Sequence, residues 1–220
     1  MKIDILSLFP EMFTNIFNES IIKRAIDKKL VEINVVNFRE FSKYNNNQVD
    51  DTPYGGGAGM VLMCEPIFEA VNSLKTKDSF VILLTPDGVK YNQKIAKDLV
   101  LKKHLIIICG HYEGFDERIR TLADMELSLG DFILTGGEIP AMAITDSIIR
   151  LIDGVITKES LASESFNDNL LDYPVYTKPR CYNNMEVPEV LLSGNHEKID
   201  IWRNKERIKR TKEKRKDLLK

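Results

Sequence analysis

The feature that most constrains this chain is an apolar run, residues 105–109, that stops abruptly at Gly110. The run reads LIIIC. A run this short and this apolar is typical of a strand buried on both faces, in a parallel sheet covered by helices. Open α/β sheets bind ligands in the loops at the carboxyl ends of such strands. The residues that follow Gly110 are therefore the first candidates for a site.

Three glycine-containing turns follow this run, at residues 110–114, 128–131 and 135–137, with a short apolar piece at 132–134. Glycine has no Cβ, so the backbone at these turns can approach a small ligand closely. Tight strand–helix turns that bind nothing would have the same composition. Turn chemistry alone leaves both interpretations open.

The rest of the chain alternates between the two periodicities of secondary structure. Strands are predicted at residues 3–8, 31–38 and 80–84, and helices at 11–29, 65–75, 92–103 and 138–152. Residues 85–88, TPDG, have the composition of a turn. The strand–helix–strand order predicts an α/β fold with a parallel sheet.

A long loop, residues 45–60, carries four glycines near its end. No Lys-Ser/Thr pair follows them, as a P-loop requires, and no strand runs directly into them, as a dinucleotide fingerprint requires. The loop is either a mobile functional loop or a disordered connector. Asp50, Asp51 and Tyr54 give it polar chemistry that a plain connector would not need.

The charge is unevenly distributed. Residues 203–220 contain ten basic and three acidic side chains, so this segment carries +7 while the rest of the chain carries −9. The asymmetry predicts a polyanionic partner, and the alternative is a solvated terminal helix. The polar stretch 158–169 indicates a domain boundary or linker.

The remaining composition excludes several classes of protein. The three cysteines lie far apart without metal-ligand spacing, so we expect no metal site and a reducing compartment. The first residues lack the apolar core of a signal peptide, and no apolar run is long enough to span a membrane. We expect a cytoplasmic protein with no membrane partner.

Several segments together resemble the bacterial tRNA (guanine-N1)-methyltransferases, which use S-adenosyl-L-methionine to methylate the guanosine at position 37, 3′ to the anticodon. The matching segments are DDTPYGGGAGM at 50–60, LTPDG at 84–88, CGHYEGFDERI at 109–119, SLGDFILTGGEIPAM at 128–142, LLDYPVYTKP at 170–179 and VPEVLLSGNH at 187–196. They run in the family's order along most of the chain.

The resemblance implies a fold and an assembly. Residues 1–157 would form an α/β cofactor domain with a deep trefoil knot, an exception to the rule against threaded chains. Residues 158–169 would be the linker, and residues 170–220 a small helical domain that binds tRNA. The proteins of this family are homodimers, in which the cofactor of one subunit faces the linker and C-terminal domain of the other.

The resemblance also assigns residues to the two ligands. The implied tRNA-binding residues are Asp50, Tyr54, Gly55, Gly56, Ser165, Arg203 and Arg207. The implied S-adenosyl-L-methionine-binding residues lie in the three knot loops: Leu84, Thr85, Pro86, Gly110, Tyr112, Glu113, Gly114, Ser128, Leu129, Gly130, Asp131, Phe132, Ile133, Leu134, Gly136 and Gly137. An alternative for Glu113 is a cap on a helix that begins near Phe115.

Methyl transfer to guanine N1 requires removal of the N1 proton by a general base. In the family a linker aspartate is the base, and the arginine that ends the preceding helix assists it. Arg150 matches that arginine. Glu164 stands where the family commonly has the aspartate, in a linker about one residue shorter, and Asp168 is the alternative base. The basic tail also ends earlier than is usual in the family.

Two other functions fit parts of the sequence. A knotted methyltransferase that modifies ribose 2′-hydroxyls would share the cofactor turns, but a linker carboxylate with Arg150 fits base methylation better. A catalytically inactive RNA-binding module would need only the basic tail. The intact glycine turns argue against it, and Glu164 in place of the family's aspartate argues for it.

Overall fold

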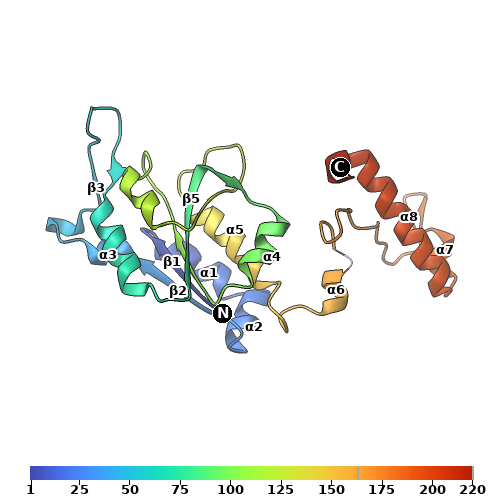
Figure 1. Cartoon of the computed structure of the whole chain (residues 1–220). Helices are drawn as coiled ribbons and strands as arrows, with labels where there is room; N and C mark the ends of the chain where they lie inside the picture. Colours follow the sequence, from blue (N-terminus) through green and yellow to red (C-terminus); the bar gives the residue numbers. More distant parts are fainter. Residues whose placement is uncertain (163, 220) are drawn as a thin grey trace. The chain divides into compact units, whose positions relative to one another are not determined.

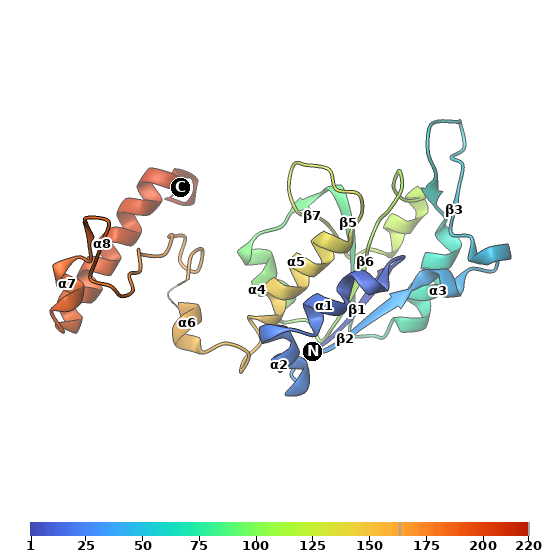
Figure 2. The same cartoon turned by 180° about the vertical axis from the view of Figure 1, so that it is seen from behind.

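The structure is a computed structural model that describes residues 1–162 and 164–219 of the chain. The chain divides into two compact units, Met1–Ile156 and Thr157–Lys220. The first unit contains a five-stranded parallel sheet with helices on both faces (Figures 1 and 2). The second unit is mainly helical.

The sheet has the strand order β2-β1-β6-β5-β7, and all of its pairings are parallel. β6 (His104–Ile108) lies between β1 (Lys2–Ser7) and β5 (Ser79–Lys90), with Lys2 and Ser79 both level with His104. All five residues of β6 are buried, which confirms the strand predicted at 105–109. The edge strands are β2 (Glu32–Asn37) and β7 (Met125–Ser128).

Alternate residues of the central strands enter two separate cores, one on each face of the sheet. Leu105 and Ile107 pack with α1 (Thr14–Phe17), α2 (Ser20–Asp27), α4 (Gln93–Leu99) and α5 (Glu138–Ile149). Ile106 and Ile108 pack with α3 (Cys64–Leu74) and with the 3-10 helices Phe38–Phe41 and Glu117–Leu122. Both figures show α3 on one side of the sheet and α4 with α5 on the other. A strand with two cores has no polar face, which explains the unbroken apolar run.

Two predicted elements differ most from the structure, and the helices predicted at 92–103 and 138–152 end earlier, at Leu99 and Ile149. The helix predicted at 11–29 is divided into the 3-10 helix Pro10–Phe13, α1 and α2, with Ser20 at φ 54°. Polar side chains at residues 18–20 compete for backbone hydrogen bonds and favour such breaks. The strand predicted to end at Leu84 continues to Lys90, because residues 85–88 form an irregularity between Leu84 and Val89, which both pair with Leu127.

The base of the glycine-rich loop is an antiparallel pair, β3 (Asp50–Asp51) with β4 (Val61–Leu62). Leu62 also forms a parallel bridge with Phe115. The backbone N–H of Leu62 donates to Gly114 O at 2.9 Å, and Asp116 N–H donates to Leu62 O at 2.9 Å. The base of the loop is therefore joined to the segment that follows β6.

The second unit contains α6 (Lys158–Ala162), the hairpin of β8 (Cys181–Tyr182) and β9 (Met185–Glu186), α7 (Glu189–Leu192), and α8 (His196–Lys214), followed by a 3-10 turn at Lys216–Leu219. Most of the basic tail lies in α8. The Asn195 side chain caps this helix by accepting a hydrogen bond from the Lys198 N–H at 3.0 Å. Ile199 and Thr211 on α8 are buried, so this helix is part of the packing of the unit.

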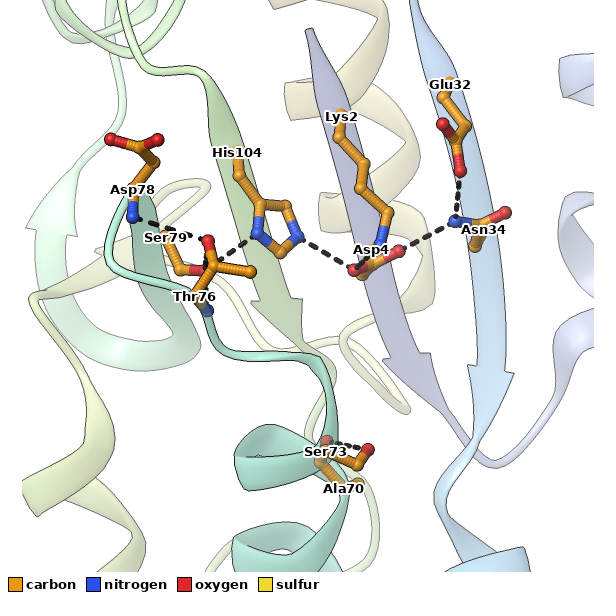
Figure 3. A network of polar contacts seen from close by, with 10 residues as sticks. All are labelled: Lys2, Asp4, Glu32, Asn34, Ala70, Ser73, Thr76, Asp78, Ser79 and His104. Atoms are coloured by element: carbon orange, nitrogen blue, oxygen red, sulfur yellow. Dashed lines mark hydrogen bonds and ion pairs between the residues drawn. The ribbon is translucent and has the colours of Figure 1, made fainter.

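A polar network crosses the amino-terminal parts of four neighbouring strands, β2, β1, β6 and β5, inside the first unit (Figure 3). Asp4, fully buried on β1, accepts hydrogen bonds from Asn34 Nδ2 at 2.9 Å and from His104 Nε2 at 2.8 Å, and forms an ion pair with Lys2 at 2.9 Å. The other nitrogen of His104, Nδ1, lies 2.7 Å from Ser79 Oγ. Burial alone would raise the pKa of Asp4, but these partners outweigh it and lower the pKa below the ordinary value of 3.8.

We expect Asp4→Asn to destabilise the first unit by about 1 to 3 kcal/mol at neutral pH, because it leaves buried partners without their carboxylate. The lowered pKa of Asp4 means that its stabilisation is present above about pH 4 and is lost as pH falls through the folded-state pKa. The difference between the variant and the wild type should therefore shrink below pH 4. Hydrogen exchange of the β1 and β6 amides in both proteins measures this difference in stability.

Asp27→Asn is the matched control, because the Asp27 ion pair with Lys23 is exposed on both sides. Surface pairs of this kind contribute between zero and about 1 kcal/mol. Equal effects of the two substitutions, or a deficit of Asp4→Asn that does not change with pH, would contradict the role given to the buried network.

Candidate functional site

A cavity of about 410 Å³ lies at the carboxyl ends of β6 and β7 and beside the irregularity within β5. Three segments form its walls: residues 84–86 of β5, residues 110–115 after β6, and residues 127–137, which run from β7 to α5. These are the three loops that the sequence predicts as cofactor-binding. The cavity size is in the range of sites that enclose a small molecule or cofactor.

The lining contains every predicted cofactor-binding residue except Asp131. Asp131 instead pairs with Lys90 at 2.5 Å, and both side chains are largely exposed. The structure thus collects in one place residues that lie far apart in the sequence. That they bind S-adenosyl-L-methionine stays a prediction.

Six further residues line the cavity that the sequence did not assign: His111, Phe115, Arg120, Leu127, Thr135 and Pro140. Most of them lie inside or beside the motifs already quoted, so motif membership could have identified them. Arg120 lies just past the end of its motif, where nothing in the sequence distinguishes it from the neighbouring charged residues.

The glycines of the walls mainly permit close approach between chain segments. A Cβ on Gly137 would lie 2.7 Å from Cys109 Cα and 2.8 Å from Gly110 N, so the backbones meet directly. The Gly137 N–H donates to Gly110 O at 2.8 Å. At Gly130 a Cβ would meet only the ring of Phe132, at 2.7 Å, and that side chain is 54% exposed.

Arg120 joins segments around the cavity through three carboxylates. Its guanidinium contacts Asp87 of the β5 irregularity at 2.9 Å, Glu117 of its own 3-10 helix at 3.0 Å, and Glu126 of β7. A hydrogen bond from Thr85, and then the nearby Arg120, lower the pKa of the exposed Asp87. The lining residue Thr85 is therefore fixed by a network that includes β7.

The segment after β6 is held in an unusual conformation. Tyr112 has φ 58°, which is uncommon for a residue with a side chain and often marks a functional site. Its hydroxyl accepts a hydrogen bond from Arg39 Nη2 at 3.2 Å. The next residue, Glu113, donates its backbone N–H to Met60 O at 3.0 Å, and a Cβ on Gly59 would meet its side chain.

Glu113 does not cap a helix, so that alternative is wrong. The 3-10 helix that follows begins at Glu117, and its cap is Asp116, whose side chain accepts from the Arg118 N–H at 2.9 Å. Glu113 is exposed, lines the cavity and lies against the glycine-rich loop.

The predicted tRNA-binding residues of the glycine-rich loop lie outside the cavity lining. Asp50 belongs to β3, and Tyr54 is fully exposed. Gly55 and Gly56 have φ of 88° and 78°, and nothing lies within 4 Å of where their Cβ atoms would be. The tip of the loop is thus open to a large partner.

The predicted catalytic pair belongs to two different units. Arg150 is half-buried at the C-terminal cap of α5, where its N–H donates to Asp146 O at 3.1 Å. Glu164 is half-buried in the second unit, in a turn where Phe166 N–H donates to Leu170 O at 2.8 Å. Ser165, predicted to contact tRNA, accepts a hydrogen bond from the Asp172 N–H at 2.9 Å.

Asp168, the alternative base, is engaged by Arg207 of α8. Two guanidinium nitrogens contact its two oxygens, at 2.5 and 3.0 Å. These hydrogen bonds lower the pKa of Asp168, which opposes the uptake of a proton. The Arg207 side chain is only 14% exposed. The sequence predicts that Arg207 binds tRNA, but in the structure its guanidinium makes an ion pair within the second unit. Arg203, also predicted to bind tRNA, lies over the ring of Tyr173, 4.8 Å from its centroid.

In the described part of the chain, no helix has both the length and the apolar character needed to cross a membrane. The same residues contain no group of three or more His, Cys, Asp or Glu side chains placed to hold a metal ion.

A comparison with known protein families shows to which family the chain belongs. The profile of the tRNA (Guanine-1)-methyltransferase TrmD family matches residues 1–220. The chain belongs to this family.

Curated relatives of the chain are named as tRNA (guanine-N(1)-)-methyltransferases. The chain is 61% identical to a tRNA (guanine-N(1)-)-methyltransferase of Malacoplasma penetrans, over 99% of this chain and 96% of that protein. It is 56% identical to one of Carboxydothermus hydrogenoformans, over 100% and 88% of the two chains. It is 55% identical to one of Staphylococcus carnosus, over 100% and 91%. The similarity therefore extends through both units.

The two glycine environments predict different outcomes for the same substitution. Gly137→Ala should destabilise the first unit by about 1 to 3 kcal/mol, because the new Cβ meets rigid backbone. Gly130→Ala should leave stability near the wild type, because the exposed Phe132 ring can move. It should nevertheless weaken S-adenosyl-L-methionine binding in calorimetry, and Gly130→Leu should abolish it. A folded Gly130→Leu protein with unchanged cofactor affinity would refute this placement of the cofactor.

Proposed function

We propose that this enzyme transfers the methyl group of S-adenosyl-L-methionine, bound in the cavity of the first unit, to N1 of guanosine 37 of tRNA. The chain is a tRNA (guanine-N1)-methyltransferase by its family membership. The observation that carries the finer proposal is the cavity, which two glycine-containing loops after β6 and β7 form together with residues 84–86 of β5. A cytoplasmic location of the enzyme is part of the proposal, because tRNA is its substrate.

The residues of the cavity fit this methyl donor. Apolar side chains such as Leu84 and Ile133 suit an adenine ring, and the main chain at Gly110 and Gly130 leaves room for hydrogen bonds to a ribose. Glu113 offers a carboxylate toward a positively charged methyl donor. When bound, S-adenosyl-L-methionine would supply an electrophilic methyl group on its sulfonium.

We also propose that the three segments of the cavity wall belong to a deep trefoil knot. We further propose that the enzyme is a homodimer. Family membership supports both. The direct backbone contact of Gly137 with Cys109 and Gly110 agrees with tightly crossed segments. In the dimer, the cavity of one subunit would face the linker of its partner, which would bring Glu164 to the methyl donor.

Guanine N1 carries a proton, so a base must remove it before or during the transfer. Glu164 is proposed for this step, and its position before Ser165 and Phe166 matches the family's base. The bidentate pairing of Asp168 with Arg207 supports the choice, because it holds Asp168 ionised with its oxygens occupied. Loss of the N1 proton places negative charge on O6, and the cationic Arg150 would stabilise that charge.

Mass spectrometry of tRNA nucleosides tests the proposed function directly. Incubation with S-adenosyl-L-methionine should produce 1-methylguanosine at position 37 alone. A methylated ribose would identify the 2′-hydroxyl methyltransferase instead. Absence of both cofactor binding and any modified nucleoside would leave only an RNA-binding function.

Glu164→Gln should preserve cofactor and tRNA binding but lower the single-turnover rate by about a hundred- to ten-thousand-fold, because only the proton acceptor is removed. Arg150→Ala should also lower the rate. The double variant should be little worse than the worse single one, since both residues act in one step. Single-turnover kinetics at saturating tRNA measure these rates.

Asp168→Asn is the matched control. It should lower the stability of the second unit by about 1 kcal/mol, because it removes the bidentate pair with the shielded Arg207. Its methylation rate at saturating tRNA should stay near the wild type. An inactive Asp168→Asn with an active Glu164→Gln would make Asp168 the base, and two active variants would exclude a linker carboxylate altogether.

The exposed lysines of the basic tail are the proposed phosphate-binding groups. Truncating α8 would remove the buried Thr211 and unfold the unit, so point substitutions give the cleaner test. Combining Lys209→Ala, Lys212→Ala and Lys216→Ala should reduce the slope of log K against log salt by about 0.7 to 0.9 for each phosphate that the variant no longer neutralises. Filter binding of tRNA across a salt series measures this slope.

Lys75→Ala with Lys77→Ala is the control pair, because both lysines are exposed on the first unit, beyond the C-terminus of α3 and away from the strand ends that form the cavity. This pair should leave the salt dependence unchanged. The tail has no role in phosphate binding if both sets of substitutions give the wild-type slope.

A further inference from the structure

A buried carboxylate and a half-buried histidine face the same small space at the cavity wall. Glu138, the first residue of α5, is only 3% exposed, and His111 lines the cavity. A Cβ on Gly136 would lie 2.3 Å from Glu138 Oε2 and 2.7 Å from His111 Nδ1. Because Gly136 has no side chain, the space between the carboxylate and the imidazole stays open.

The carboxylate is fixed from one side. Ser7, at the end of β1, donates a hydrogen bond from its hydroxyl to Glu138 Oε1 at 2.8 Å. Ser7 Oγ itself accepts from the Phe9 N–H at 2.9 Å. These contacts hold Oε1 and leave Oε2 beside Gly136.

The histidine lacks a hydrogen-bond partner at this position among the residues that the structure describes. His111 Nδ1 is buried and has no hydrogen-bond partner among the described residues. Native proteins almost always give such a buried group a partner. The other oxygen beside the same space, Gly110 O, already accepts from the Gly137 N–H at 2.8 Å. Glu138 Oε2 is the acceptor that remains.

We propose that Glu138 is a positioning residue of the methyl-transfer site. The Nδ1–H of His111 donates to Glu138 Oε2, and Nε2 then presents its lone pair to an amino group of the bound ligand. A neutral imidazole has one N–H, so the acceptor at Nδ1 decides which nitrogen stays basic. The two groups are not hydrogen-bonded in this structure, and side-chain rotation into the space above Gly136 would join them.

The groups around the pair do not compete for its proton. Burial, and then the charge of Glu138, raise the pKa of the Cys109 thiol, which therefore stays neutral. The Tyr112 ring packs edge-on against His111, with 4.9 Å between centroids, and its hydroxyl is engaged by Arg39. The apolar ring of Phe9 lies 4.9 Å from the His111 ring, centroid to centroid.

Nitrogen NMR of the full chain, labelled with ¹⁵N-histidine, tests the inference without cofactor. The chain has three histidines, and His111→Gln assigns the signal of His111. The wild type at pH 8 should show the Nδ1–H tautomer. In Glu138→Gln the Ser7 hydroxyl keeps the amide oxygen, so the amide N–H₂ faces Nδ1 and His111 should change to the Nε2–H tautomer.

Asp4→Asn is the matched control, because Asp4 is also a buried carboxylate and contacts a different histidine, His104. It should alter the signals of His104 and leave those of His111 unchanged. An Nε2–H tautomer of His111 in the wild type, or the same tautomer in the wild type and Glu138→Gln, overturns the inference.

The effect on catalysis gives a second readout. Glu138→Gln should raise KM for S-adenosyl-L-methionine roughly tenfold, as expected for a group that orients a histidine, with a smaller change in kcat. Combining it with His111→Gln should add little to the worse single variant. Additive effects would overturn the coupling. The inference rests on the proposed function only for the identity of the ligand: if the wild type failed to bind this methyl donor, the proposed function would fail, while the tautomer would still decide the role of Glu138.

Discussion

The burial of β6 on both faces determines where the site can be. Its side chains belong alternately to two cores, and β1 and β5 take up its backbone hydrogen bonds on either side. A strand held this way cannot shift its register without moving buried side chains into the wrong core. The chain after Cys109 therefore turns at a fixed point. β5 and β7 run parallel to β6, so residues 84–86 and 127–137 lie at the same edge of the sheet as the chain after Cys109. These three segments therefore surround one cavity.

The sequence was sufficient for several features that depend on local pattern, although it missed the breaks in the helix predicted at 11–29. The apolar run of β6 located the buried strand, and the glycine turns located the loops. It failed where distant segments decide the outcome. β5 continues past Leu84 because Leu127 of a later strand pairs on both sides of the irregularity. Gly137 has its particular role because Cys109 lies against it. Neither contact can be inferred from residues near the glycine or the strand end.

The candidate site was predictable through its motifs and not through its charges. Motif residues converge on the cavity, whereas the partners of the ionisable side chains follow from the fold. Asp131 pairs with Lys90 outside the cavity lining, and Asp168 pairs with Arg207 across 39 residues of sequence. As sequence letters, Asp168 and Glu164 are equivalent carboxylates. The bidentate arginine favours the ionised form of Asp168 and makes it a poor proton acceptor, which the sequence letter alone does not reveal.

The two ends of the sheet use carboxylate–histidine chemistry for different purposes. At the amino ends, His104 contacts Asp4 through one nitrogen and Ser79 through the other, so it has no nitrogen left for a ligand. This pair can only stabilise the sheet. At the carboxyl ends, Glu138 is buried while His111 lines the cavity, and one carboxylate oxygen faces the imidazole across Gly136. An acceptor supplied to one nitrogen there would leave the other available to a ligand. The difference arises from position, since His111 lies at the wall of the cavity and His104 lies at the opposite ends of these parallel strands.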